Sequence, residues 1–93
     1  MNTLNKVVRK NESIAYRIIE GEALLVSPAD NLIYPLNPVA TRIWELLDNK
    51  RETHQIISIV SEEFDALPAT IQNDTVSFID ELASKGLVVI GNE

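Results

Sequence analysis

The first part of the chain alternates short apolar runs with turn residues, a pattern typical of β-structure. Residues 15–19 and 22–27 are rich in aliphatic and β-branched side chains, and Gly21 lies in the two-residue gap between them. A glycine in such a gap supplies the positive φ of a tight hairpin turn. A turn cluster at 27–31 then leads to a third apolar run at 32–36. The pattern predicts a three-stranded antiparallel meander.

The third predicted strand contains Pro35. Proline has no N–H to donate to a ladder, so within sheets it is confined to edges, bulges and strand ends. Because strands that follow each other in sequence usually pair, the third strand should have the second on one side and nothing on the other. This open side is the natural docking surface of the predicted fold.

Three helices are predicted after the strands, at about 38–47, 53–64 and 70–85, which makes the chain an α+β protein. The first has Asn37 as its cap and Pro38 at its first position. Thr53 is expected to cap the second, and Gly86 stands where the third needs a left-handed C-terminal residue. An apolar tail at 88–90 either adds a terminal strand or covers the core. The apolar face of the first helix recurs at helical spacing in Ala40, Ile43, Trp44 and Leu47.

Residues 1–13 are polar and without periodicity, so we expect a flexible N-terminal arm, or at most a short docking segment, followed by a single domain over 14–90. No apolar run reaches the ~20 residues that span a membrane, and the N-terminus does not have the pattern of a signal peptide. The chain also has no cysteine. These features favour a cytoplasmic protein without a membrane partner.

The net charge of −6 is concentrated near the C-terminus. Residues 1–61 carry seven acidic and seven basic side chains, whereas from Glu62 onward seven acids accompany one base, Lys85. So acidic a segment is a poor surface for phosphates, which argues against a nucleic-acid partner.

No residue pattern indicates catalysis, a cofactor or a metal. His54 is the single histidine and has no cysteine beside it, so we interpret it as a surface or capping residue. The acids Glu62 and Glu63 are adjacent in sequence and therefore point to different faces of a helix. Trp44 belongs to an apolar helix face and is expected in the core. Tyr34 is either an anchor for the helices or a contact for a ligand.

The chain resembles the PqqD-like proteins, also called precursor-peptide recognition elements, over about residues 14–90. The resemblance lies in the order and spacing of the matching residues rather than in one motif. They are Gly21 to Val26, Leu36-Asn37 with Ala40, Ile43 to Asp48, Thr53 with Ile56, Phe64, Asp74, Leu82, and Lys85 to Leu87. The turn at 27–31 and the residue after Gly86 differ from the members that act in quinone synthesis, which favours another peptide pathway.

The resemblance implies a winged-helix-like domain that binds the leader of a ribosomally made precursor peptide by β-augmentation. A partner enzyme, commonly a radical S-adenosylmethionine maturase, a protease or a cyclase, would then act on the bound peptide. The strand contribution to the binding site maps to Leu32, Ile33, Tyr34 and Pro35. On the third helix, the residues expected to contact the leader are Val76, Ile79, Asp80 and Ala83, with Phe78 and Leu82 left to the core.

Two other functions are compatible with the sequence. A winged-helix DNA-binding module has the same kind of elements, but its recognition helix needs basic and amide side chains. The predicted third helix offers Gln72, Asn73 and Lys85 among several acids. Alternatively, the open strand edge pairs with a second copy of the chain and forms a homodimer.

Overall fold

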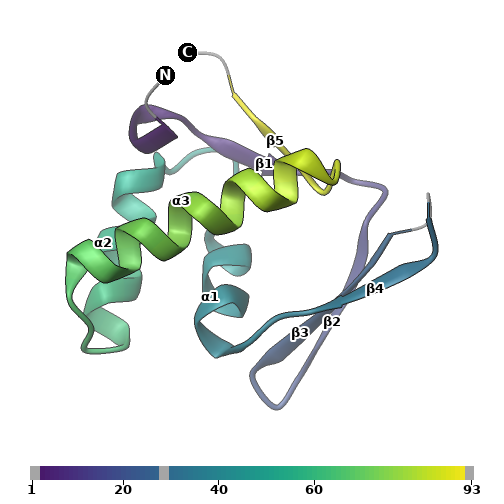
Figure 1. Ribbon diagram of the computed structural model, residues 1–93, viewed down its shortest axis with the longest axis horizontal. Helices are drawn as coiled ribbons and strands as arrows, with labels where there is room; N and C mark the ends of the chain where they lie inside the picture. The colour runs from purple at the N-terminus through teal and green to yellow at the C-terminus, as the bar shows by residue number, and fades with distance from the viewer. Residues whose placement is uncertain (1–2, 28–29, 92–93) are drawn as a thin grey trace.

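Two antiparallel sheets and three helices make up the computed structural model, which describes residues 3–27 and 30–91 (Figure 1). A short 3₁₀ helix, Thr3–Asn5, precedes the first strand. The strands are β1 (Val8–Lys10), β2 (Ala15–Ile19), β3 (Glu22–Ser27), β4 (Leu32–Pro35) and β5 (Val88–Ile90). The helices are α1 (Pro38–Leu46), α2 (Thr53–Glu63) and α3 (Pro68–Ser84). None of the described helices is long and apolar enough to cross a membrane.

The predicted meander is confirmed by the strand order β2-β3-β4. Its first turn places Glu20 at φ 52° and Gly21 at φ 82°, the two positive values that a tight hairpin requires. Leu25 on β3 pairs with Tyr16 on one side and with Tyr34 on the other, so the three side chains share one face of the sheet. Among the described strands, β4 pairs only with β3, and it therefore forms an edge of this sheet.

Local signals in the sequence set the ends of α1 and α3. The Asn37 side chain accepts a hydrogen bond from the Ala40 amide at 2.8 Å, as expected of an N-cap. Pro68 lies at the start of α3, two residues earlier than the sequence predicted. Gly86 follows α3 at φ 76°, and the Leu87 N–H donates to the Leu82 carbonyl at 2.9 Å. This arrangement satisfies carbonyls that a helix end leaves unpaired.

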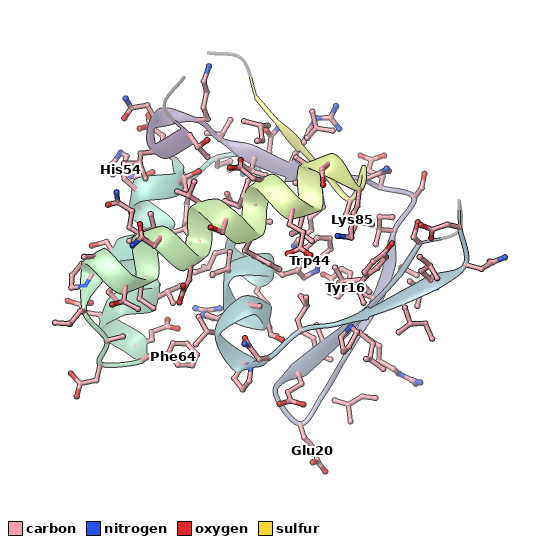
Figure 2. All side chains as sticks on the ribbon, in the orientation of Figure 1. Tyr16, Glu20, Trp44, His54, Phe64 and Lys85 are labelled. Atoms are coloured by element: carbon pink, nitrogen blue, oxygen red, sulfur yellow. The ribbon has the colours of Figure 1, made fainter. Side chains whose placement is uncertain are left out.

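A core of aliphatic side chains around Trp44 joins the helices to the three-stranded sheet. Trp44 is fully buried, as predicted, and Tyr16 of β2 meets its ring edge-on with centroids 5.4 Å apart (Figure 2). Ile43, Ile56 and Leu87 are each 1 % exposed or less. Burial of these side chains is the main force holding α1, α2 and the chain end together.

The N-terminal segment is docked against the rest of the chain from residue 3 onward. β1 pairs with β5, and Val8 is 1 % exposed. The tail at 88–90 thus forms the terminal strand that the sequence allowed, and its partner strand comes from the N-terminal segment. In Figure 1 the two strands lie side by side above α3.

Thr53 holds the N-terminal segment in place. The sequence suggested it as the cap of α2, but the N-cap is Glu52 and Thr53 is the first helical residue. Its backbone N–H and its Oγ1 both donate to the Lys6 carbonyl, each at 3.0 Å. The buried Thr53 therefore fastens the N-terminal segment to the start of α2 rather than capping the helix.

Candidate functional site

The edge of β4 is the one strand edge of the meander that lies beside α3, and it is apolar and open. Leu32 and Ile33 are 51 % and 61 % exposed. The Leu36 N–H donates to the Ala23 carbonyl at 2.8 Å, which fixes the alternation of the antiparallel ladder. Residues 34 and 36 therefore turn their backbone groups toward β3, and Ile33 turns its N–H and C=O toward the open side.

Pro35 also falls on an outward-facing position of this alternation. The missing N–H of Pro35 therefore removes no hydrogen bond between β3 and β4. The Pro35 carbonyl remains available as an acceptor at the open edge. The extended backbone continues through Asn37, at φ −75° and ψ 174°. The Asn37 N–H has no hydrogen-bond partner among the described residues. From Ile33 to Asn37 the edge thus offers two donors and two acceptors, with one gap at Pro35.

A groove of about 250 Å³ runs between this edge and α3. Its surface combines apolar side chains with a few polar groups at the rim. The lining residues are Tyr34, Pro35, Leu36, Asn37, Ala40, Phe78, Glu81, Leu82 and Lys85. A concave apolar surface beside unpaired backbone groups can receive an extended peptide, whose alternate side chains would enter the groove.

Charged and aromatic groups face each other across the groove. The Lys85 ammonium lies 3.0 Å from a carboxylate oxygen of Glu81 and 5.9 Å from the centroid of the Tyr34 ring. The Tyr34 hydroxyl donates to Asp30 at 3.1 Å. Partial desolvation raises the pKa of Tyr34, and the hydrogen bond to Asp30 adds to this effect. The Leu32 N–H is the main cause of the lowered pKa of Asp30. Tyr34 is thus half-buried: it packs against the edge of the core and also lines the groove.

The four predicted strand residues lie together along the edge, but those predicted on α3 do not lie opposite them. Ile79 is fully buried and cannot contact a ligand. Val76 and Asp80 line a different depression, together with Thr3 and the end of the N-terminal segment. Ala83 is half-buried and packs against the core. None of the four residues predicted on α3 therefore lines the groove beside β4.

The physical reason is the rotation of α3 about its own axis. Its buried stripe consists of Ile71, Thr75, Ile79 and Leu82. At 100° per residue, Val76, Asp80 and Ala83 flank that stripe on one side, and Phe78, Glu81 and Lys85 flank it on the other. The structure turns the second flank toward β4. Phe78, which the sequence assigned to the core, is half-buried and lines the groove.

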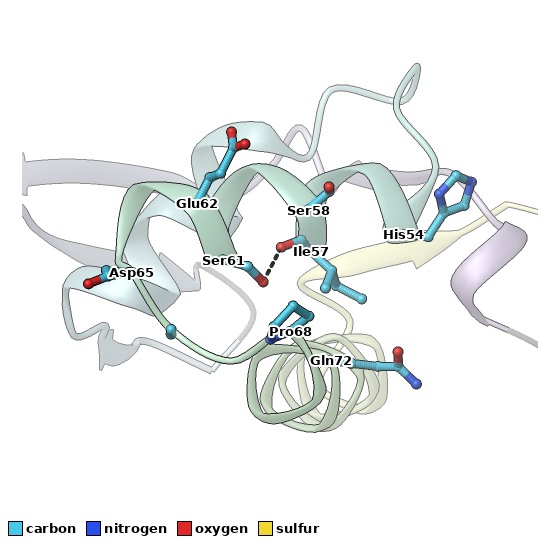
Figure 3. Close-up of a pocket in the computed structure, with 9 residues that line it drawn as sticks. His54, Ile57, Ser58, Ser61, Glu62, Asp65, Pro68 and Gln72 are labelled. Carbon is cyan, nitrogen blue, oxygen red and sulfur yellow. Dashed lines mark hydrogen bonds between the residues drawn. The ribbon is translucent and has the colours of Figure 1, made fainter.

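A second depression, of about 480 Å³, lies between α2 and α3, away from the β4 edge (Figure 3). His54, Glu62, Asp65 and Gln72 give it a polar rim, and Ser61 at its wall donates to the Ile57 carbonyl at 2.7 Å. The His54 ring lies 2.8 Å from Glu52, in keeping with a surface or capping residue. Within residues 3–27 and 30–91, no group of three or more histidine and carboxylate side chains is placed to hold a metal ion.

Comparison with protein families identifies one family. The sequence profile of the family described as "Coenzyme PQQ synthesis protein D (PqqD)" matches residues 22–88. No curated protein sequence matches the chain.

Two solved structures share the fold. TbiB1, solved in complex with the TbiA(beta) leader peptide, is 24% identical with a TM-score of 0.77, and the match covers 86% of this chain and 93% of that one. The second is the PqqD truncation of PqqCD from Methylobacterium extorquens, described as a functional, stand-alone recognition element for ribosomally synthesized and post-translationally modified peptides. It is 26% identical with a TM-score of 0.74, over 89% of this chain and 88% of that one.

Proposed function

Since the chain belongs to the PqqD family, we propose that it is a non-catalytic module that captures the leader segment of a ribosomally made precursor peptide. The observation that carries this proposal is the open edge of β4 beside the groove. Unpaired backbone groups on an edge strand are a template for another extended chain. The leader-bound state of TbiB1, which shares the fold, supports this interpretation.

The leader adds a strand to β4. Across Ile33 it exchanges two backbone hydrogen bonds, and it donates one more to the Pro35 carbonyl. The Asn37 N–H, at the end of the edge, supplies a further donor. These bonds give affinity that does not depend on side chains, and the side chains that enter the groove beside Phe78 give selectivity.

The captured leader is presented to a separate maturation enzyme, for which a radical S-adenosylmethionine protein is our first candidate. Catalysis belongs to that partner. This division of labour fits the comparison with the Methylobacterium extorquens domain, which is described as a stand-alone recognition element. Because the precursor is made on ribosomes, we place the binding step in the cytoplasm. The turn at 27–31 and Leu87 lead us to favour a peptide pathway other than quinone synthesis.

The acidic surface of α3 does not favour the DNA-binding alternative. The helix contains no lysine or arginine between Pro68 and Ser84, and its exposed side chains include Asp74, Asp80 and Glu81. A helix that reads DNA needs donors and positive charge along its exposed face.

An NMR titration of the isotope-labelled protein tests the proposal. The probes are synthetic leader peptides from precursor genes that neighbour this one. We expect chemical-shift changes in residues 32–37 and on the flank of α3 that holds Phe78. Phe78→Ala should weaken binding about tenfold, the loss expected for an aromatic contact. The matched control is Val76→Ala, on the opposite flank of the same helix.

A leader that binds with equal affinity to the Phe78→Ala and Val76→Ala proteins would contradict the proposed site. Thermal melts of both variants show whether either change acts through stability. If no neighbouring leader shifts any resonance at millimolar concentration, the proposed function itself is wrong.

A further inference from the structure

The groove does not end where β4 ends. A pocket of about 410 Å³ adjoins it and shares three residues with it, Asn37, Ala40 and Phe78. We call it the Val39 pocket. Its other lining residues come from the first turns of α1 and from the N-terminal half of α3, and they are Val39, Ile43, Ile71 and Asp74.

The course of the backbone leads a bound peptide toward this pocket. The extended edge runs through Asn37, and α1 begins at the next residue. A peptide that follows the edge past Pro35 therefore meets the first turn of α1, where the Val39 pocket opens. A peptide bound along β4 would therefore contact the groove first and the Val39 pocket next.

The chemistry of the Val39 pocket differs from that of the groove. Val39, Ile43, Ile71 and Phe78 give it aliphatic and aromatic walls. The groove has a lysine, Lys85, at its rim, whereas the Val39 pocket has a single charged residue, Asp74. The Asp74 side chain is exposed and makes neither a hydrogen bond nor an ion pair with any described residue. An apolar side chain followed by a basic one matches this pocket in shape and charge.

We propose that the Val39 pocket is a second anchor site, which holds an apolar side chain of the leader next to a lysine or arginine that pairs with Asp74. This inference rests on the proposed function and extends it to the class of leader. The residues that α3 and its C-terminal end contribute to the groove lie on average about seven positions after those that α3 contributes to the Val39 pocket. At the rise of an α-helix, the two sets are centred about 10 Å apart along the helix axis. An extended chain covers that distance in about three residues. The recognised motif therefore has two apolar residues about two to four positions apart, with a basic residue beside the second.

Selection from a displayed library of random 12-residue peptides tests the inference with the full chain as bait. The peptides retained should carry the two apolar residues at this spacing and the basic residue. Asp74→Lys should then weaken the binding of the best peptide about tenfold, since it replaces attraction by repulsion. The control is Asp80→Lys, an exposed acid on the opposite flank of α3, which should change the affinity less than twofold.

A second pair of variants tests the apolar wall. Val39→Gln should weaken the best peptide severalfold, and Val76→Gln, another half-buried valine, should leave its affinity unchanged. Retained peptides that depend on Phe78 but not on Val39 or Asp74 would overturn the second anchor site and leave the proposed function standing. If the library yields no peptide that binds, the proposed function and this inference both fail.

Discussion

Ile33 and Pro35 occupy equivalent backbone positions on β4, but only Ile33 offers a donor to the open edge. Pro35 therefore weakens the edge as a template while leaving the pairing with β3 intact. Proline on an edge is one device by which proteins prevent their sheets from pairing with each other. We interpret Pro35 as a compromise between binding a leader and avoiding self-association.

Removing a backbone N–H from the open edge should weaken leader binding, and adding one should strengthen it. Ile33→Pro removes the outward N–H without breaking a bond to β3, and it should weaken leader binding about two- to tenfold, the range expected for one hydrogen bond. Pro35→Ala supplies the missing N–H and should tighten binding by a similar factor. Isothermal titration calorimetry with one leader measures both.

Two controls separate the backbone effect from side-chain effects. Ile33→Ala keeps the N–H and removes the side chain, and Pro68→Ala removes a proline far from the edge. Weaker binding by Pro35→Ala than by the unchanged protein would mean that the leader does not use this backbone position.

Ile79 and Phe78 are neighbours on α3 with different roles. Ile79→Asp places an unpaired charge in the core, because Ile79 is 0 % exposed. We expect a loss of about 4 kcal/mol or more, enough to unfold a domain of this size. Circular dichroism should show loss of helix for Ile79→Asp, whereas Phe78→Asp should remain folded. A folded Ile79→Asp protein would contradict the placement of this side chain.

At the scale of elements, the signals that act over a few residues were sufficient to predict the hairpin at Gly21, the cap at Asn37 and the end of α3 at Gly86. What they could not predict was the strand β1. It contributes a single fully buried side chain, Val8, and its partners are distant in sequence. The Lys6 carbonyl, for example, is held by a residue 47 positions away.

The flank of α3 that lines the groove was not predictable for a related reason. Periodicity identified the buried stripe of α3, but two flanks border any such stripe. Which flank faces β4 depends on how α3 lies across the sheet, and that is set by tertiary packing. The β4 side needed no such information, because Pro35 alone indicated an edge strand.

Two substitutions measure how much β1 contributes to stability: one of the buried Val8 on β1, and a control at the exposed Val89 on its partner strand β5. Val8→Ala should lower the free energy of unfolding by about 2 kcal/mol, since it removes two buried methyl groups and leaves a cavity. Val89→Ala should change it by less than about 0.5 kcal/mol, because Val89 on β5 is 41 % exposed. Urea denaturation measures both values. Equal effects would contradict the docking of the N-terminal segment.

For the whole molecule, several acids are held in their charged form by their partners. The Arg42 guanidinium lowers the pKa of Glu63 from 4.5, and the Arg51 N–H is the main cause of the lowered pKa of Asp48, from 3.8. A carboxyl group whose pKa is lowered on folding stabilises the fold above its unfolded pKa. That contribution is lost as the pH falls through the folded pKa.

The melting temperature should therefore be nearly constant above about pH 5 and should fall as the medium is acidified below pH 4.5. Glu63→Gln and Asp48→Asn should each reduce the slope of this acid limb, because they remove one proton-binding difference between the folded and unfolded states. Thermal melts between pH 2.5 and 7 measure the slope. An unchanged slope in both variants would show that these pairs do not contribute.

The central claim is that a leader adds a strand at the edge of β4, and the exchange of the Ile33 amide with solvent tests it most directly. In the free protein this N–H points to the open edge, so we expect rapid exchange. In the presence of saturating leader, NMR should show slow exchange at Ile33 and Asn37, together with shifts on the Phe78 flank of α3. Binding that leaves the Ile33 amide unprotected, or that protects residues around His54 instead, would contradict strand addition.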